Sequence, residues 1–338
     1  MACPVGINTG KMVKQLRMEN HSRGSRFVAI MVASNFKNVE AIIGFGLRAG
    51  SSVNGIFGKN IMKNLTSSLH RISNSFPIWT SQLTKPPRGK YQYPQNPEVL
   101  YFPACITRMM GDDIERKDSQ LEIFMKLSAK AGIAVLFPEE VKGLCCGQAF
   151  SSKGYKQAYL ITVEKTIRSL HHLSKNGSFP VVMDITSCTN TILNCREDLS
   201  EEVKNMFDAL VFLDVIDYLN DWILPRVIIS RKMANIALHP VCALSKNESQ
   251  FLKFKNIAAT CSENYFIAPS AGCCGTAGDR GFFYPELTGA ATSRESNEIR
   301  ESEFDGYYST AKTCEMSMSE ATGRNYRSIL YLLEDVIS

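Results

Sequence analysis

Two pairs of adjacent cysteines, each followed directly by glycine, are the residues of this 338-residue chain that point most clearly to chemistry. They occur in GLCCGQAF at 143–150 and in GCCGTAGD at 272–279. One cysteine precedes and one follows each pair, with intervals of 39 and 41 residues around the first pair and 30 and 39 around the second. The first quartet is Cys105, Cys145, Cys146 and Cys188, and the second quartet is Cys242, Cys273, Cys274 and Cys314.

Four thiolates that converge from separate loops can hold an iron–sulfur cluster or a zinc ion, because soft metals prefer sulfur ligands. The glycines after the pairs, Gly147 and Gly275, lack a Cβ and would let the backbone approach a bulky inorganic group. Single cysteines often pack as small buried hydrophobes. We expect that simpler role for Cys195 and Cys261, which lie outside the pattern, since two matching quartets arise rarely by chance.

Basic residues and a histidine lie close to the cysteines in the sequence. Positive charge lowers the pKa of a thiol and offsets the negative charge of a cluster, so Lys142 is a candidate neighbour of the first quartet. His239, in HPVC, is a candidate to tune the second site or relay a proton, with a packed core position as the alternative. Other basic residues for which a solvated surface position is the simpler interpretation are Arg108, Lys246, Arg280 and Lys312.

From Glu98 onward, short apolar segments alternate with longer segments of helical periodicity, and the apolar segments lead to the cysteines. The segments are VLYFPAC, IAVLFPEE and PVVMDITSC, and then NIALHPVC, NYFIAPSAGCC and GYYSTAKTC. This order predicts an α/β fold made of two duplicated units with short parallel sheets related by a pseudo-dyad. Because the carboxyl ends of parallel strands share one edge of a sheet, each quartet should gather there.

The predicted units span residues 93–228 and 229–338, and they follow a helical segment and linker at 1–92. The five prolines within 77–97 predict an exposed linker or arm. Residues 1–100 carry a net charge of +10 and the remainder carries −5. We expect the basic segment to dock onto an acidic partner, and no aromatic-rich basic stripe supports nucleic-acid binding.

The quartets resemble the CCG cysteine-rich domain of the heterodisulfide reductase B subunit, the glycolate oxidase iron–sulfur subunit and lactate-utilisation proteins. The family motif ends in CxxC, whereas the corresponding segments here are ITSC and AKTC, so Ile185 and Ala311 replace its first cysteine. Single-cysteine endings are typical of the glycolate oxidase and lactate branches. The segments at 2–17 and 307–336 also resemble the C-terminal part of FAD-linked D-lactate or D-2-hydroxyglutarate dehydrogenases with fused iron–sulfur domains.

This resemblance implies an electron-transfer module with iron–sulfur clusters of the 4Fe-4S type, which passes electrons from FAD to a quinone or another acceptor. It makes Cys3 an orphan ligand of a ferredoxin-type cluster, and it places the flavin catalytic domain outside this chain, on a flavoprotein partner. The enzyme implied is an FAD-dependent 2-hydroxyacid oxidoreductase, of which this chain is the electron-accepting part.

The residues alone also allow a structural zinc scaffold without a redox role at one or both quartets. Thiol–disulfide exchange at the adjacent pairs is a weaker alternative, because no C-x-x-C motif is present. The first residues lack the apolar stretch of a secretory signal, and no apolar run approaches the ~20 residues that span a bilayer. We therefore expect a cytoplasmic location, with peripheral contact at the inner face of a membrane as a further expectation.

Overall fold

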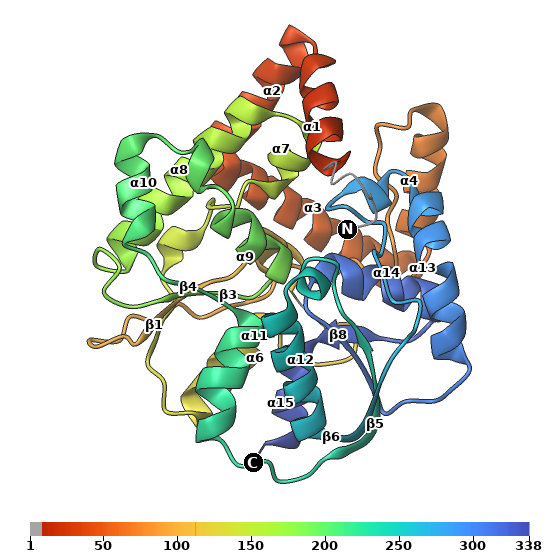
Figure 1. Ribbon diagram of the computed structural model, residues 1–338. Helices are drawn as coiled ribbons and strands as arrows, with labels where there is room; N and C mark the ends of the chain where they lie inside the picture. The colour runs from red at the N-terminus through yellow and green to blue at the C-terminus, as the bar shows by residue number, and fades with distance from the viewer. Residues whose placement is uncertain (1–8, 112, 338) are drawn as a thin grey trace.

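The computed structural model describes residues 9–111 and 113–337, and it contains a helical N-terminal segment followed by two α/β units (Figure 1). The N-terminal segment consists of α1 (Thr9–Glu19), α2 (Arg23–Ser34), α3 (Phe36–Phe57) and α4 (Ile61–Ile72). The orphan ligand predicted at Cys3 lies outside the described residues.

The first unit contains a four-stranded parallel sheet with the strand order β2-β1-β3-β4. Its strands are β1 (Val99–Phe102), β2 (Val135–Leu136), β3 (Val181–Met183) and β4 (Phe212–Asp214). Its main helices are α5 (Cys105–Met110), α6 (Gln120–Lys130), α7 (Gln148–Lys153), α8 (Lys156–Leu173), α9 (Thr186–Leu193) and α10 (Glu201–Asp208). After β4 the chain forms α11 (Val215–Asp217), a π-helix (Tyr218–Ile223) and a 3₁₀ turn (Leu224–Arg226).

The second unit repeats this plan with the strand order β6-β5-β7-β8, again all parallel. Its strands are β5 (Met233–His239), β6 (Ser262–Ile267), β7 (Gly306–Ser309) and β8 (Tyr326–Ser328). Its helices are α12 (Glu248–Cys261), α13 (Pro285–Arg300), α14 (Lys312–Thr322) and α15 (Ile329–Val336). Short 3₁₀ turns occur at Glu139–Val141, Arg196–Asp198, Leu244–Lys246 and Arg280–Phe282. The expected duplicated α/β fold is confirmed.

The fourth strand of each unit was not predicted. Each is a three-residue strand at the edge of its sheet, and unlike the segments that were predicted as strands it leads to no cysteine. In the C-terminal segment, Tyr326–Ser328 pairs with β7 before α15 begins. The Ser328 hydroxyl accepts the backbone N–H of Leu330, so a strand passes directly into a capped helix.

The two units pack against each other in a pseudo-symmetric way, because the helix after the last strand of each unit packs on a helix of the other. Helix α15, which follows the last strand of the second unit, packs on α6 of the first, while α11 and the π-helix pack on α12 of the second. Arg116 of the first unit forms ion pairs with Glu334 and Asp335 of α15. One hydrophobic core includes residues of both units, so the two sheets form a continuous structure.

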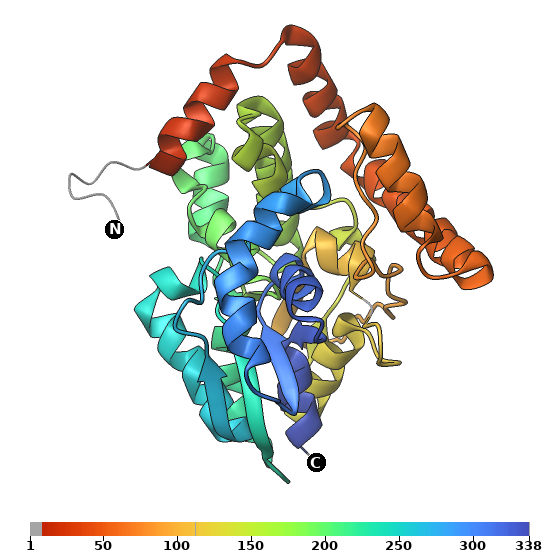
Figure 2. The same ribbon diagram turned by 90° about the vertical axis from the view of Figure 1, so that its right-hand side faces the viewer.

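The N-terminal helices form an arch across one end of the molecule, opposite the C-terminus (Figure 2). Helix α1 contacts α7, α2 contacts α8, and α3 contacts α5. No single helix among the described residues has the length and apolarity needed to cross a membrane, although α2 and α3, bent by 86°, pass that test as a pair on length and composition alone.

The proline-rich segment lies on the surface as an arm attached to both units, and it is not a free linker. Its Ile78 N–H donates to the Phe282 carbonyl oxygen at 2.7 Å, and Trp79 is 9 % exposed. Further along, the Thr84 hydroxyl donates to the Met110 carbonyl oxygen at 2.8 Å. The prolines prevent helix formation, but the apolar residues between them bind the segment to the surface of both units.

Candidate metal centres

The first quartet lies beyond the carboxyl edge of the first sheet. Cys105 begins α5, Cys145 and Cys146 lie in the loop before α7, and Cys188 lies in the first turn of α9. Three of the four thiols are buried and Cys105 is half-buried. The sequence predicted strands running into the cysteines, but Cys105 and Cys188 belong to the helices that follow the strands.

The four thiols of the first quartet form a hydrogen-bonded series. The Sγ atoms of Cys105 and Cys145 are 3.6 Å apart, and Cys146 hydrogen-bonds to both Cys145 and Cys188. These hydrogen bonds act on the thiol pKa values in both directions, and the removal of the thiols from water raises all of them. The pKa of every thiol in this quartet therefore lies above that of free cysteine.

Gly147 shapes the loop that carries the cysteine pair. Its φ of +79° lies in the left-handed region, and a Cβ there would come within 2.7 Å of the Tyr159 ring. This turn directs the Gly147 N–H toward Cys145 Sγ at 3.4 Å. Thr166 of α8 fixes the same loop, since its hydroxyl accepts the N–H of Cys145 and lies 2.8 Å from the Cys145 carbonyl oxygen. The glycine is thus needed for the turn and for packing on protein, and the approach of its backbone to an inorganic group stays a prediction.

A buried ion pair joins the first quartet to the N-terminal arch. Arg108 binds Glu40 of α3 through two hydrogen bonds of 2.7 and 2.8 Å and also donates to the carbonyl oxygens of Pro103 and Leu144, each at 2.6 Å. Glu40 in addition accepts the Gly143 N–H at 3.0 Å. The expectation of a solvated Arg108 is wrong, because this guanidinium closes the loops on both sides of the thiols and lowers the pKa of the Cys105 thiol in part.

Lys142, the other basic candidate at the first quartet, has different partners. Its ammonium binds Glu139 at 2.8 Å and lies 4.9 Å from the centre of the Tyr91 ring. A role for Lys142 beside the metal stays a prediction. Among the residues described, it is the Arg108 guanidinium whose positive charge interacts with the Cys105 and Cys145 thiols.

The second quartet occupies the equivalent edge of the second sheet. Cys242 follows β5, the Cys273–Cys274 pair follows β6, and Cys314 lies in the first turn of α14. Cys242 and Cys273 are exposed to solvent, whereas Cys274 and Cys314 are buried. The Sγ atoms of Cys274 and Cys314 are 3.1 Å apart, and Cys242 hydrogen-bonds to Cys273.

The thiol pKa values of the second quartet diverge. The hydrogen bond from Cys242 lowers the pKa of Cys273, and the Gly275 N–H, His239 and Lys246 act in the same direction. The hydrogen bond from Cys314 lowers the pKa of Cys274, to about 6, with a further contribution from Thr276. In each hydrogen-bonded couple, Cys242 with Cys273 and Cys274 with Cys314, one sulfur is thus a stabilised thiolate and the other keeps its proton.

Gly275 and His239 occupy the positions expected from the sequence. Gly275 has a φ of +75°, and a Cβ there would lie 2.9 Å from the Leu287 carbonyl oxygen, so it repeats the turn seen at Gly147. His239 is fully buried, and its Nδ1 lies 2.7 Å from Glu295 Oε1. Its Nε2 has no hydrogen-bond partner among the described residues. It is thus a packed side chain whose electrostatic influence reaches Cys273 and Cys274.

The two quartets flank the junction of the units. Thr186, two residues before Cys188, donates its N–H to the Thr310 carbonyl oxygen at 3.4 Å, and the two threonine hydroxyls are 3.1 Å apart. Thr310 in turn precedes Cys314 by four residues. The structure thus brings the ends of β3 and β7, and the helices that carry the last cysteine of each quartet, to one interface.

The remaining described cysteines are separate from both quartets. Cys195 and Cys261 are fully buried, and burial raises the pKa of each to about 12, which confirms the expectation of inert packed thiols. Sequence reasoning missed Glu40 and Thr166, which lie in segments without any cysteine. No local signal marks either residue, because each acts on a loop distant in sequence.

The donor set at each site consists of thiols, approached by a glycine N–H and by positive charge. Within the described part of the chain, no group of three or more histidine, cysteine, aspartate or glutamate side chains is arranged to hold a single metal ion. The sulfur atoms instead interact in a series at the first quartet and in two pairs at the second. This chemistry suits a cofactor that accepts sulfur ligands from several directions, such as an iron–sulfur cluster.

Comparison with known proteins agrees with this geometry. Two segments, residues 99–192 and 236–319, match the family described as CCG, the cysteine-rich domain, and together they cover more than half of the chain. The chain is also similar to an uncharacterized iron–sulfur protein of Methanocaldococcus jannaschii, with 21 % identity over 235 residues, 69 % of this chain. That alignment covers 44 % of the archaeal protein, so the chain spans less than half the length of this relative. The chain belongs to the CCG cysteine-rich domain family and carries two copies of its domain.

Proposed function

We propose that this chain is the iron–sulfur electron-transfer module of a flavin-linked 2-hydroxyacid dehydrogenase. The first and second quartets each hold a cluster of the 4Fe-4S type. Electrons arrive from a reduced FAD on a flavoprotein domain or partner and leave to a quinone or another acceptor. The observation that carries the proposal is the matched pair of four-thiol sites, each with a glycine N–H directed at the first sulfur of its cysteine pair.

Several features of the chain's own residues support cluster binding. Backbone N–H donors and nearby cations stabilise sulfur that carries negative charge, and they tune the reduction potential of a cluster. The Gly147 and Gly275 N–H groups, and Arg108 near the first quartet, supply such interactions. The similarity to a protein named as an iron–sulfur protein, although distant, supports the same cofactor.

The junction of the units supports transfer between the two sites. The last ligand of each quartet lies in the first turn of a helix that begins beside the contact between Thr186 and Thr310. A buried, continuous core around this contact holds the two sites in a fixed relation. Fixed separation is what electron transfer requires of the protein, since the redox chemistry belongs to the cofactor.

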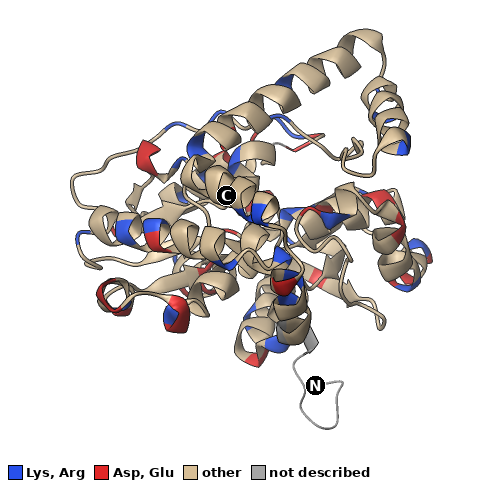
Figure 3. Ribbon diagram, turned by 90° about the horizontal axis from the view of Figure 1, so that it is seen from above, with Lys and Arg blue, Asp and Glu red and all other residues tan. Residues whose placement is uncertain are grey.

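We further propose that the flavoprotein docks on the outer face of α2–α4. This face exposes large apolar side chains, including Ile42 and Phe45, which are 69 % and 73 % exposed. The described N-terminal helices contain only two acidic residues, Glu19 and Glu40, and Glu40 is bound to Arg108. Figure 3 shows how acidic and basic residues are distributed over the ribbon. An apolar face bordered by basic residues matches an acidic partner surface with an apolar centre.

Metal analysis of anaerobically purified protein tests the cofactor. We expect roughly four iron and four sulfide per quartet. Cys145→Ser should remove the first centre, whereas Cys195→Ser should leave the metal content unchanged because Cys195 lies outside both quartets. Equal loss of iron from the two variants would show that the assignment of ligands is wrong.

Reduction of the clusters by a purified FAD-containing D-2-hydroxyacid dehydrogenase and D-lactate tests the flavin link. Ile42→Ser combined with Phe45→Ser should slow this reduction about tenfold if the α2–α4 face is the docking surface. Ile228→Ser is the matched control, since Ile228 is exposed and apolar but lies outside that face. Rapid reduction by dithionite but none by the flavoprotein would reject the flavin link while leaving the clusters in place. If the double variant were reduced more slowly only when anionic lipid vesicles are present, the α2–α4 face would bind a membrane instead of the flavoprotein.

A structural zinc scaffold is the second candidate. The 3.6 Å between Cys105 and Cys145 is close to the edge of about 3.8 Å in a tetrahedron with Zn–S bonds of about 2.3 Å. Among the residues that the structure describes, no third side chain is placed with these two to hold one metal ion. Stoichiometric zinc without acid-labile sulfide in the analysis above would establish this candidate.

A further inference from the structure

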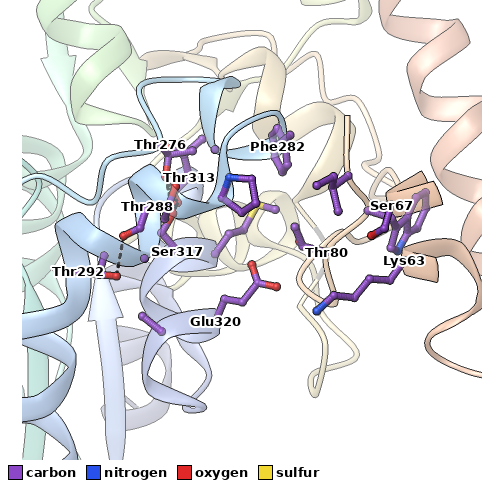
Figure 4. A pocket seen from close by; sticks show the side chains of 17 residues that line it. Lys63, Ser67, Thr80, Thr276, Phe282, Thr288, Thr292, Thr313, Ser317 and Glu320 are labelled. Carbon is purple, nitrogen blue, oxygen red and sulfur yellow. Dashed lines mark hydrogen bonds between the residues drawn. The ribbon is translucent and has the colours of Figure 1, made fainter. Parts of the chain in front are cut away.

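A cavity of about 380 Å³ lies between the N-terminal arch and the second unit (Figure 4). Helix α4 and the segment around Trp79 form one side, and α13 and α14 form the other. The hydrogen bond from the Ile78 N–H to the Phe282 carbonyl oxygen joins its two sides. The volume is at the lower end of the range for small-molecule sites, ~300–1,000 Å³, which suits a single or fused ring.

This cavity directly adjoins the second quartet. Thr276 lines it, and the Thr276 hydroxyl is 3.4 Å from Cys274 Sγ. Thr313, which precedes Cys314, and Ser317 line the same wall, and Ser317 is hydrogen-bonded to Thr276. A molecule against this wall is therefore separated from a sulfur of the proposed cluster by one side chain.

The lining favours an uncharged, flat ligand. Trp79, Phe282 and Met316 give the cavity broad apolar surfaces. Its charged residues are Lys63 and Glu320, one of each sign, and no arginine is present in the described lining. A carboxylate or phosphate ligand would meet Glu320 without a compensating guanidinium, so a 2-hydroxy acid or a nucleotide fits poorly.

Hydrogen-bond donors are available for a ligand with carbonyl oxygens. The hydroxyls of Thr80 and Thr288 are buried and lack a partner within the described structure, which is uncommon for hydroxyls inside a protein. After rotation about Cα–Cβ, each could donate to an acceptor in the cavity. Lys63 lies on the α4 side as a further donor, as Figure 4 shows.

We propose that this cavity binds the ring of a quinone beside the second quartet. Binding itself needs only the apolar walls and the donors. Reduction of the bound quinone rests on the proposed electron-transfer function: two electrons delivered through the second quartet from the reduced flavoprotein, together with two protons from water, convert its two carbonyl groups to hydroxyls. The product is the hydroquinone, and the flavoprotein is oxidised by the same two electrons.

Trp79 provides a direct readout of binding. The chain has two tryptophans, and Trp222 does not line the cavity, so Trp222→Phe leaves Trp79 as the reporter. The probe is 2,3-dimethoxy-5,6-dimethyl-1,4-benzoquinone, whose fully substituted ring resists addition of the exposed Cys242 and Cys273 thiols. We expect saturable quenching of Trp79 fluorescence in the holoprotein, with free tryptophan as the reference for collisional quenching. Quenching that rises without saturation would overturn the proposal.

Gly289→Leu should block the cavity, because Gly289 lines it and a Cβ there has no other atom within 4 Å. We expect at least tenfold weaker binding. Gly46→Leu is the matched control: Gly46 is also helical with open space around its Cβ position, but it does not line the cavity. An equal affinity in the two variants would place the quinone elsewhere and reject the site.

Two further measurements separate ligand class and electron transfer. Glu320→Gln should change the quinone affinity less than twofold, and D-lactate at millimolar concentration should not displace the quinone. Displacement by D-lactate would show that the cavity takes a 2-hydroxy acid. Saturable binding without hydroquinone formation by the dithionite-reduced protein would retain the binding site and reject its redox role. A lack of iron in the protein, by contrast, would reject the proposed function and leave the binding result standing.

Discussion

The first and second quartets occupy equivalent places in equivalent sheets, yet their surroundings differ. The first is covered by the N-terminal arch: α3 supplies Glu40 to Arg108, and α1 packs on α7 behind the cysteine loop. In the second, Cys242 and Cys273 are exposed, and a cavity adjoins Cys274. The duplicated fold thus provides two similar sets of ligands, and the N-terminal helices cover the first set but not the second.

This difference also separates the thiol chemistry of the two sites. Burial and the hydrogen bonds between thiols raise the pKa of every first-quartet cysteine. In the second quartet, the hydrogen bond from Cys242 lowers the pKa of Cys273, with contributions from the Gly275 N–H and Lys246. The hydrogen bond from Cys314 lowers the pKa of Cys274, with a contribution from Thr276. We infer that the second site is suited to exchange with an external ligand and the first to transfer within the protein.

The largest effect that we expect comes from the buried ion pair at the first quartet. Arg108→Met should lower the free energy of unfolding by about 3–5 kcal/mol, because it leaves the Glu40 carboxylate buried without its partner. Denaturant unfolding followed by circular dichroism measures this change. Lys142→Met is the control, and it should cost at most about 0.5 kcal/mol, since its pair with Glu139 is exposed.

The double variant Arg108→Met with Glu40→Gln sharpens this test. Removing the second charge should recover part of the lost stability, because no unpaired carboxylate remains. If Arg108→Met and Lys142→Met had equal effects, the first quartet would not depend on the arch in the way that the structure indicates.

Thiol reactivity of the metal-free protein should differ between the quartets by about a hundredfold at pH 7, because the thiolate is the reactive form. Cys273 should react first with iodoacetamide, since it is exposed and its pKa is lowered. As the pH falls toward 6, Cys273 should stay reactive, whereas Cys145 and Cys188 should react only above the pKa range of ordinary cysteine. Mass-spectrometric peptide mapping of samples taken at successive times gives the labelling rate of each cysteine.

Denatured protein is the reference for this experiment, because unfolding removes the differences in burial and should equalise the rates. Equal labelling of Cys145 and Cys273 in the folded protein, checked by circular dichroism, would contradict the distinction between a covered and an open site.

A smaller effect is expected at the glycines that follow the cysteine pairs. Gly147→Ala should cost about 2 kcal/mol, because φ is +79° and the new Cβ would lie 2.7 Å from the Tyr159 ring. Gly278→Ala should cost about 1 kcal/mol, since its φ is +84° but no atom lies within 4 Å of the Cβ position. Thermal unfolding and iron content provide the measurement. A larger loss from Gly278→Ala than from Gly147→Ala would mean that backbone strain alone, without packing, governs these turns.

The parts of the site that sequence reasoning found share one property: they recur. The quartets appear twice with similar spacing, and the strand order around them also repeats, so the carboxyl-edge rule places each quartet without knowledge of any contact. Residues that occur once were not found. Arg108 was expected on the surface because nothing near it in sequence indicates that Glu40, 68 residues earlier, completes a buried ion pair.

The same reason explains the errors in the fold. β4 and β8 are short edge strands that lead to no cysteine, and their pairing with β3 and β7 identifies them as strands. The proline-rich segment has the composition of a linker, but Trp79 packs against Gly50 of α3, where a Cβ would lie 2.5 Å from its ring. The composition of this segment excludes a helix, but its contacts with α3 determine where it lies on the surface.

The amino-acid sequence by itself determined the duplicated α/β plan and the eight thiols at the edges of two sheets, because hydrophobic periodicity and regular spacing are local properties that survive without any knowledge of contacts. Only the tertiary structure decided which quartet is covered and which is open, and which polar residues reach the sulfur atoms. Burial and the resulting thiol pKa values depend on which distant segments meet in space, and no local pattern records those meetings.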